Sequence, residues 1–175
     1  MATASASPAR VRRVEVPRAL RAREDLAGYH YASAFASPVP DGRPLTPEQW
    51  ARVTFETAPL PMRWCLMLGW TGVLGLRLGP KSSPRHVLGW RVTRPGPGSV
   101  TLEAPSRLVD AHNVVLVEDA QILWATTVRF KGRAGRVAWG VAAPVHHLMV
   151  PLLLRRALRS AAGRRRTAPG SRSAA

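Results

Sequence analysis

The chain has 175 residues, enough for one domain with short tails. With 46% hydrophobic and 21% charged residues, it is neither a disordered polyelectrolyte nor a fully membrane-embedded protein. Its single cysteine, Cys65, excludes an intrachain disulfide framework and a zinc site built from several cysteines.

The formal net charge of +16 is concentrated toward the two ends of the chain. Residues 155–175 contain seven arginines and no acidic residue. Only Lys81 and Lys131 are lysines, a bias typical of GC-rich genomes, so the arginine count by itself does not indicate a nucleic-acid-binding protein. We expect a solvated basic tail that makes at most weak, salt-dependent contact with anionic membrane or nucleic acid.

Three segments are predicted from composition. Residues 1–24 lack the apolar stretch of a secretory signal, and we expect them to be disordered, with room for a short strand at Val14–Val16. Residues 25–161 are predicted to form the folded domain. Residues 162–175 are small, basic and interrupted by Pro and Gly, which predicts a disordered tail.

The first predicted elements are a strand and a helix. Alternating aromatic and small residues predict a strand over Gly28–Phe35. Thr46, Pro47 and Gln49 form a helix-start signature with a capping box, and this helix should end near Thr57, before two prolines. Residues 62–78 are apolar on nearly all sides, which predicts a buried helix or buried irregular chain.

Four strands are then predicted at about 88–93, 100–104, 108–117 and 121–130, joined by turns. A two-residue turn at Asp119-Ala120 places Asn113 opposite Thr126 on an otherwise apolar face. The same register places Asp110 opposite Arg129 on the other face. A slip by one residue would mix the two faces, so this antiparallel register is predicted.

Residues 133–160 form the last predicted element. Their 18 charge-free residues, 137–154, are long enough to cross a membrane, but Pro144, Pro151 and two histidines favour a helix laid across the sheet. The stripe expected to be buried consists of Trp139, Val141, Val145, Leu148, Met149 and Leu152.

The fold class is therefore α+β: a curved antiparallel sheet of about five strands around a long C-terminal helix, with a helical insertion after the first strand. This order, and the segments GYHYASAF, TPEQWARVTFETAP, LGLRLGP, HVLGW, VVLVEDAQILWATTVRF and VAWGVAAPVHHLMVPLLLRRA, resemble the START-like helix-grip superfamily. Its members include polyketide cyclases and lipid-transfer domains, and the chain is most similar to a small bacterial branch. The resemblance implies a ligand space between sheet and helix.

No catalytic signature accompanies this fold. The sequence has no phosphate-binding glycine loop, no HExxH motif and no nucleophile elbow, so no cofactor and no metal are predicted. His146 and His147 are adjacent and would point about 100° apart on a helix, which suits a structural or pocket-mouth role better than chelation. Cys65 lies among apolar residues and is predicted to be a buried thiol.

The candidate ligand site combines aromatic residues with few polar ones. Asn113 and Thr126 either bond each other within a closed core or orient a ligand. The candidate ligand-binding residues are Tyr31, Trp90, Asn113, Trp124, Thr126, Trp139 and His146.

These features favour a cytoplasmic, non-catalytic binding protein for a small hydrophobic molecule or lipid. One alternative is a cyclase- or dehydratase-like enzyme that acts on a polyketide-like compound, with Tyr31, His146 or His147 as its acid or base. Another is a peripheral membrane protein held by residues 155–166 and the apolar segment 62–78. No feature of the sequence identifies the ligand or the oligomeric state.

Overall fold

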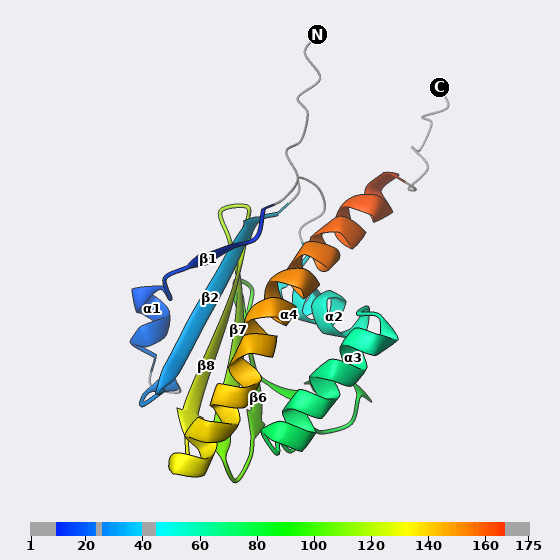
Figure 1. The fold of residues 1–175 in the computed structure, drawn as a ribbon. Helices are drawn as coiled ribbons and strands as arrows, with labels where there is room; N and C mark the ends of the chain where they lie inside the picture. Colours follow the sequence, from blue (N-terminus) through cyan, green and yellow to red (C-terminus); the bar gives the residue numbers. More distant parts are fainter. Residues whose placement is uncertain (1–9, 24–25, 40–44, 167–175) are drawn as a thin grey trace, which may run out of the picture.

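One antiparallel sheet organises the protein (Figure 1). The computed structural model describes residues 10–23, 26–39 and 45–166. Within them, the strands are β1 (Arg12–Val14), β2 (Tyr31–Pro38), β3 (Ser82–Ser83), β4 (His86–Val87), β5 (Trp90–Pro95), β6 (Ser99–Pro105), β7 (Val109–Glu118) and β8 (Gln121–Phe130). Their order across the sheet is β1-β2-β8-β7-β6-β5-β4-β3.

The sheet has eight strands in this described part, not about five. The strands without a counterpart among the five predicted ones are β1, β3 and β4, which have three, two and two residues. A strand this short cannot display the alternation of polar and apolar residues that reveals a strand in a sequence. The α+β class and the long C-terminal helix are as predicted.

The predicted register of β7 and β8 is confirmed at every pair. Asn113 lies opposite Thr126, and Asp110 lies opposite Arg129 with an ion pair of 2.7 Å. Asp119 and Ala120 form the turn, with φ of 48° and 55°. Positive φ at both central residues matches the twist of the flanking strands, so the turn and the pairing agree.

The helices are α1 (Arg18–Arg21), α2 (Pro47–Glu56), α3 (Leu60–Met67), the π-helix η2 (Leu68–Val73) and α4 (Arg133–Arg166). The predicted capping box is present at the start of α2, where Gln49 N donates to Thr46 Oγ1 and Thr46 N donates to Gln49 Oε1. These two bonds satisfy backbone donors that the first helical turn leaves free.

The sheet is covered on both faces (Figure 1). Helices α2, α3 and α4 lie on one side, over the main core that contains Trp50, Trp124 and Leu153. On the other side, Val16 and Leu20 from the α1 region pack against outward residues of β2, β7 and β8. Residues 10–23 therefore have defined structure although the sequence predicted a disordered segment, because their few apolar side chains cover the outer face of the sheet.

Helix α4 is continuous from Arg133 to Arg166, so the first residues of the predicted tail are helical. The rest of that tail, 167–175, lies outside the described residues. In the described chain, α4 is the one helix long and apolar enough to cross a membrane by length and composition; 28% of its most apolar window is buried.

The buried stripe predicted for α4 is wrong in part. Trp139 and Met149 are buried, but four other residues of that stripe are exposed: Val141, Val145, Leu148 and Leu152. Core contacts come instead from Val150, Leu153, Leu154, Ala157 and Leu158. Both faces of α4 are apolar, so the sequence alone could not show which face meets the sheet.

The expectation of burial also fails for much of the segment 62–78. Trp64 and Leu68 are 73% and 69% exposed, and Cys65 is exposed rather than a buried thiol. In α3 only Leu66 is buried, and the helix lies beside α4 on the same side of the sheet (Figure 1). Leu74 and Leu76, after η2, return the chain to the core.

Candidate ligand site

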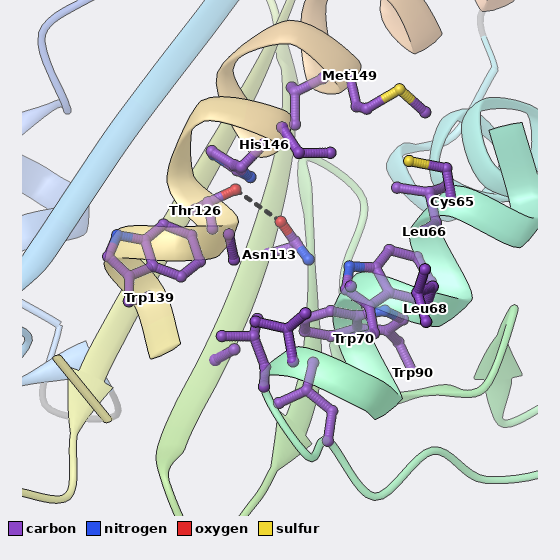
Figure 2. A pocket seen from close by; sticks show the side chains of 18 of the residues that line it. Cys65, Leu66, Leu68, Trp70, Trp90, Asn113, Thr126, Trp139, His146 and Met149 are labelled. Atoms are coloured by element: carbon purple, nitrogen blue, oxygen red, sulfur yellow. Dashed lines mark hydrogen bonds between the residues drawn. The ribbon is translucent and has the colours of Figure 1, made fainter. Parts of the chain in front are cut away.

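A pocket of about 200 Å³ lies between α4, the α3–η2 segment and the inner face of β7 and β8 (Figure 2). Its lining is almost entirely apolar; the polar side chains in it are Asn113, Thr126 and His146, together with Cys65 and the indole groups. The apolar wall comes mainly from Phe55, Leu66, Leu68, Trp70, Val73, Leu74, Leu76, Trp90, Ala111, Trp139, Val141, Ala142, Val145, Met149, Val150 and Leu153.

The wall opposite α4 depends on the π-helical turn of η2. This wider turn carries Trp70 against Phe55 and Trp90, with ring centroids 5.1 and 5.3 Å apart in edge-to-face contact. Gly75, with φ of +61°, ends the segment in a backbone conformation that L side chains rarely adopt. The segment therefore forms a wall of packed aromatic rings on this side of the pocket.

The mouth of the pocket lies between two exposed apolar helix faces. Leu68 on η2 and Val141 on α4 both line the pocket, and they are 69% and 62% exposed. Val145 and the exposed Cys65 also line it. A ligand would therefore enter between α4 and α3–η2 without unfolding the sheet.

Asn113 is the polar centre of the inner sheet face. Its Oδ1 accepts hydrogen bonds from Thr126 Oγ1 at 2.7 Å and from Trp124 Nε1 at 3.0 Å. An indole nitrogen can only donate, so the Asn113 atom facing Trp124 must be the oxygen. The orientation of this amide is thus fixed by chemistry.

The other end of the Asn113 amide faces the pocket (Figure 2). Its nitrogen points away from Thr126, and no described residue accepts a hydrogen bond from it. Asn113 is nevertheless buried, with 5% of the residue exposed. The indole N–H groups of Trp90 and Trp139, two further lining residues, are fully buried without an acceptor among the described residues. The unpaired polar groups of the lining are therefore hydrogen-bond donors.

A second polar group lies beside the pocket, where β2 meets α4. Tyr31 Oη lies 3.0 Å from His147 Nε2, and Ser33 Oγ lies 3.2 Å from His146 Nε2. Burial, with smaller contributions from His147 and Arg13, lowers the pKa of His146 to about 3. Burial also raises the pKa of the Tyr31 hydroxyl. Both groups are therefore uncharged at neutral pH.

Five of the seven candidate residues line the pocket: Trp90, Asn113, Thr126, Trp139 and His146. The other two lie in contact with lining residues. Trp124 bonds Asn113, and Tyr31 packs on Trp139 with ring centroids 4.6 Å apart.

Sequence reasoning missed the wall contributed by α2, α3 and η2, above all Phe55 and Trp70. Of the two tryptophans in the apolar segment 62–78, Trp70 lines the pocket and Trp64 does not. The apolar composition of the segment indicated core packing and not a pocket wall.

In the described ranges, no group of three His, Cys, Asp or Glu side chains could hold a metal ion. Comparison of the chain with protein-family models, with curated proteins and with solved structures finds no match.

Proposed function

We propose that this protein binds a small hydrophobic molecule that carries a hydrogen-bond acceptor, such as a carbonyl oxygen, in the pocket between the sheet and α4. The observation that carries the proposal is the NH₂ group of Asn113, which faces an apolar space with no acceptor from the described chain. In this proposal the chain is a START-like helix-grip protein; the antiparallel sheet and long C-terminal helix are compatible with that assignment.

Asn113 Nδ2 has no acceptor among the described residues and is a free donor at the surface of the pocket. A ligand acceptor placed against Nδ2 would form a hydrogen bond worth about 0.5–1.5 kcal/mol net. The ligand group must accept rather than donate, because Oδ1 already receives two hydrogen bonds. A carbonyl oxygen fits best, since a hydroxyl could accept from Nδ2 but would leave its own proton without a partner. The ligand class is therefore a ketone, aldehyde, ester or quinone with an apolar body.

The volume of the pocket limits the size of this body. A cavity of about 150 Å³ holds benzene, whereas sites for drug-sized ligands span about 300–1,000 Å³. At about 200 Å³, the pocket suits a bicyclic compound or a short acyl chain. The side chains at the mouth, Leu68, Val141 and Val145, leave room for a longer tail to extend outward.

The burial of His146 disfavours an enzyme that would use this residue as its base. This residue is the pocket-lining side chain that a cyclase- or dehydratase-like reaction would use as base, and Ser33 is its hydrogen-bond partner. A pKa of about 3 leaves the imidazole a weak base, far from the value that general-base catalysis requires near pH 7. His146 is therefore unsuited to act as a general base, which favours ligand binding over a reaction that would rely on this residue.

The test uses the fact that Asn113 is the only asparagine in the chain. Selective ¹⁵N-asparagine labelling gives one side-chain NH₂ pair in the NMR spectrum, and it belongs to the group in question. The protein is titrated with 1-tetralone, 1-tetralol and tetralin, which share one bicyclic body. We expect 1-tetralone to move the NH₂ protons downfield and to bind most tightly.

Two results would contradict the proposal. One is that no compound perturbs the Asn113 NH₂ pair at its solubility limit. The other is that tetralin perturbs this pair as much as 1-tetralone does, because contact with the ring and not with an acceptor would then cause the shift. Thr93→Val on β5 is the control variant: Thr93 does not line the pocket, so this variant should preserve the response.

A further inference from the structure

The exposed large apolar side chains of the described chain all lie on one pair of helical segments. Along α3 and into η2 they occur at every fourth residue, and along α4 they follow the same helical spacing. We call these rows the α3 ridge (Leu60, Trp64 and Leu68) and the α4 ridge (Val137, Val141, Val145, Leu148 and Leu152).

The two ridges flank the mouth of the pocket. Leu68 from the α3 ridge and Val141 and Val145 from the α4 ridge line its opposite sides. Helices α3 and α4 lie on the same side of the sheet (Figure 1). The ridges therefore place exposed apolar side chains on both sides of one opening. A large surface of this kind usually meets another molecule rather than water.

The charges on these helices are all of one sign. The segments α3, η2 and α4 contain no acidic residue, and the whole stretch from 57 to 102 contains none either. The described arginine side chains on them are Arg63, Arg133, Arg136, Arg155, Arg156 and Arg159. Five of the six are exposed, and Arg63 is partly exposed. An apolar surface bordered by arginines and free of carboxylates is complementary to a negatively charged partner with an apolar interior.

We infer that the α3 and α4 ridges dock this protein on an anionic phospholipid bilayer. The ridge side chains enter the acyl region, and the surrounding arginines contact the phosphate groups. A second copy of the chain fits less well, because a symmetric contact between these helices would bring arginines together with no carboxylate from either helix to pair them. A membrane-spanning α4 also fits less well, since its opposite face supplies Leu153, Leu154 and Leu158 to the core.

The inference does not rest on ligand binding, since the ridges and the arginines exist whether or not the pocket is occupied. If both proposals hold, docking would place the pocket mouth against the lipid phase, where hydrophobic molecules dissolve. The two proposals can therefore fail separately.

The experiment measures co-sedimentation with vesicles of phosphatidylcholine alone and of phosphatidylcholine with about 30% phosphatidylglycerol. The variants are Trp64→Glu on the α3 ridge and Leu148→Glu on the α4 ridge. Neither residue lines the pocket. The control is Ala19→Glu on α1, which changes the net charge equally on the other face of the sheet.

We expect the wild type and Ala19→Glu to bind the anionic vesicles with similar partition coefficients and to bind neutral vesicles much more weakly. Each ridge variant should lower partitioning by about tenfold or more, because it places a carboxylate in the apolar contact. Trp64 is the one exposed tryptophan of the described chain, so its emission should shift to the blue on binding. Trp64→Phe should bind but lose most of that shift.

Four results would overturn the inference. One is that the wild type pellets with neither vesicle. Another is that the ridge variants bind as well as Ala19→Glu, since attraction by charge alone would then explain the binding. Sedimentation in the absence of vesicles, or a stable dimer in light scattering that the ridge variants abolish, would assign the surface to a second copy. In each case the response of the Asn113 NH₂ pair to 1-tetralone in the ridge variants still reports on ligand binding separately.

Discussion

Asn113 accepts from two buried donors, so its replacement by leucine should be unusually costly for one side chain. Leucine has a similar size but offers no acceptor. Trp124 Nε1 and Thr126 Oγ1 would then lose their partner while remaining buried, at 1% and 4% residue exposure. Each orphaned donor costs about 1–3 kcal/mol, so Asn113→Leu should destabilise the protein by about 2–6 kcal/mol.

Thr126→Val should cost much less. It removes one hydrogen bond, while Asn113 Oδ1 keeps its bond from Trp124, so we expect a loss of about 0.5–1.5 kcal/mol. In the double variant, Thr126 no longer presents an orphaned hydroxyl. Asn113→Leu should therefore cost about 1–3 kcal/mol less in the Thr126→Val background than in the wild type. The double variant stays destabilised because Trp124 remains unpaired.

The assay is urea unfolding of the wild type, the two single variants and the double variant, followed by far-UV circular dichroism. The free energies of unfolding are compared where the m-values of the four proteins agree. An unfolding free energy of Asn113→Leu within about 0.5 kcal/mol of the wild-type value would refute this prediction. It would mean that neither Trp124 Nε1 nor Thr126 Oγ1 depends on Asn113 Oδ1. Strict additivity of the two substitutions would refute the hydrogen bond between Asn113 and Thr126.

Three further predictions concern stability. The pKa of His146 is lowered from 6.5 to about 3 in the folded state, so on acidification the unfolded state binds the proton first. The free energy of unfolding should therefore fall by about 1.4 kcal/mol per pH unit below pH 6. His146→Gln should flatten this dependence in unfolding curves measured between pH 6 and 4.5. Gly135→Ala should lower the melting temperature because its Cβ would overlap the carbonyl oxygen of Leu108, whereas Gly140→Ala, with open space around it, should raise stability by about 0.5–1 kcal/mol. Ala120→Gly should stabilise the β7–β8 turn by about 1 kcal/mol by relieving a φ of 55°, and an unchanged or lower unfolding midpoint would contradict this.

The sequence predicted the β7–β8 hairpin fully because several independent constraints agreed there. Apolar pairing on one face, the pairing of Asp110 with Arg129 on the other and a two-residue turn allow one register only. The start of α2 was equally clear, because Thr46 and Gln49 make reciprocal capping bonds within one turn. Both features depend on residues that are close in sequence.

The orientation of the long helices could not be predicted in the same way. Helix α4 is apolar on two faces, and which face meets the sheet depends on residues far along the chain. Val141 and Leu148 therefore appeared to be core residues, although they are exposed. For the site, the opposition of Asn113 and Thr126 was visible in the register, whereas the second bond from Trp124 depends on side-chain rotamers that no spacing rule gives.

The ends of the sheet bear on how this protein avoids self-association. An unpaired strand edge is a template for another chain, and short, charged edge strands reduce that risk. At one edge, β1 pairs with Ala34, Phe35 and Ala36 of β2 and carries Arg12 and Arg13, both exposed, on its two faces. At the opposite edge, β3 has two residues. Loss of β1 would uncover the apolar middle of β2, so replacement of Arg12 and Arg13 by valine, or removal of β1, should favour aggregation at high concentration rather than simple unfolding.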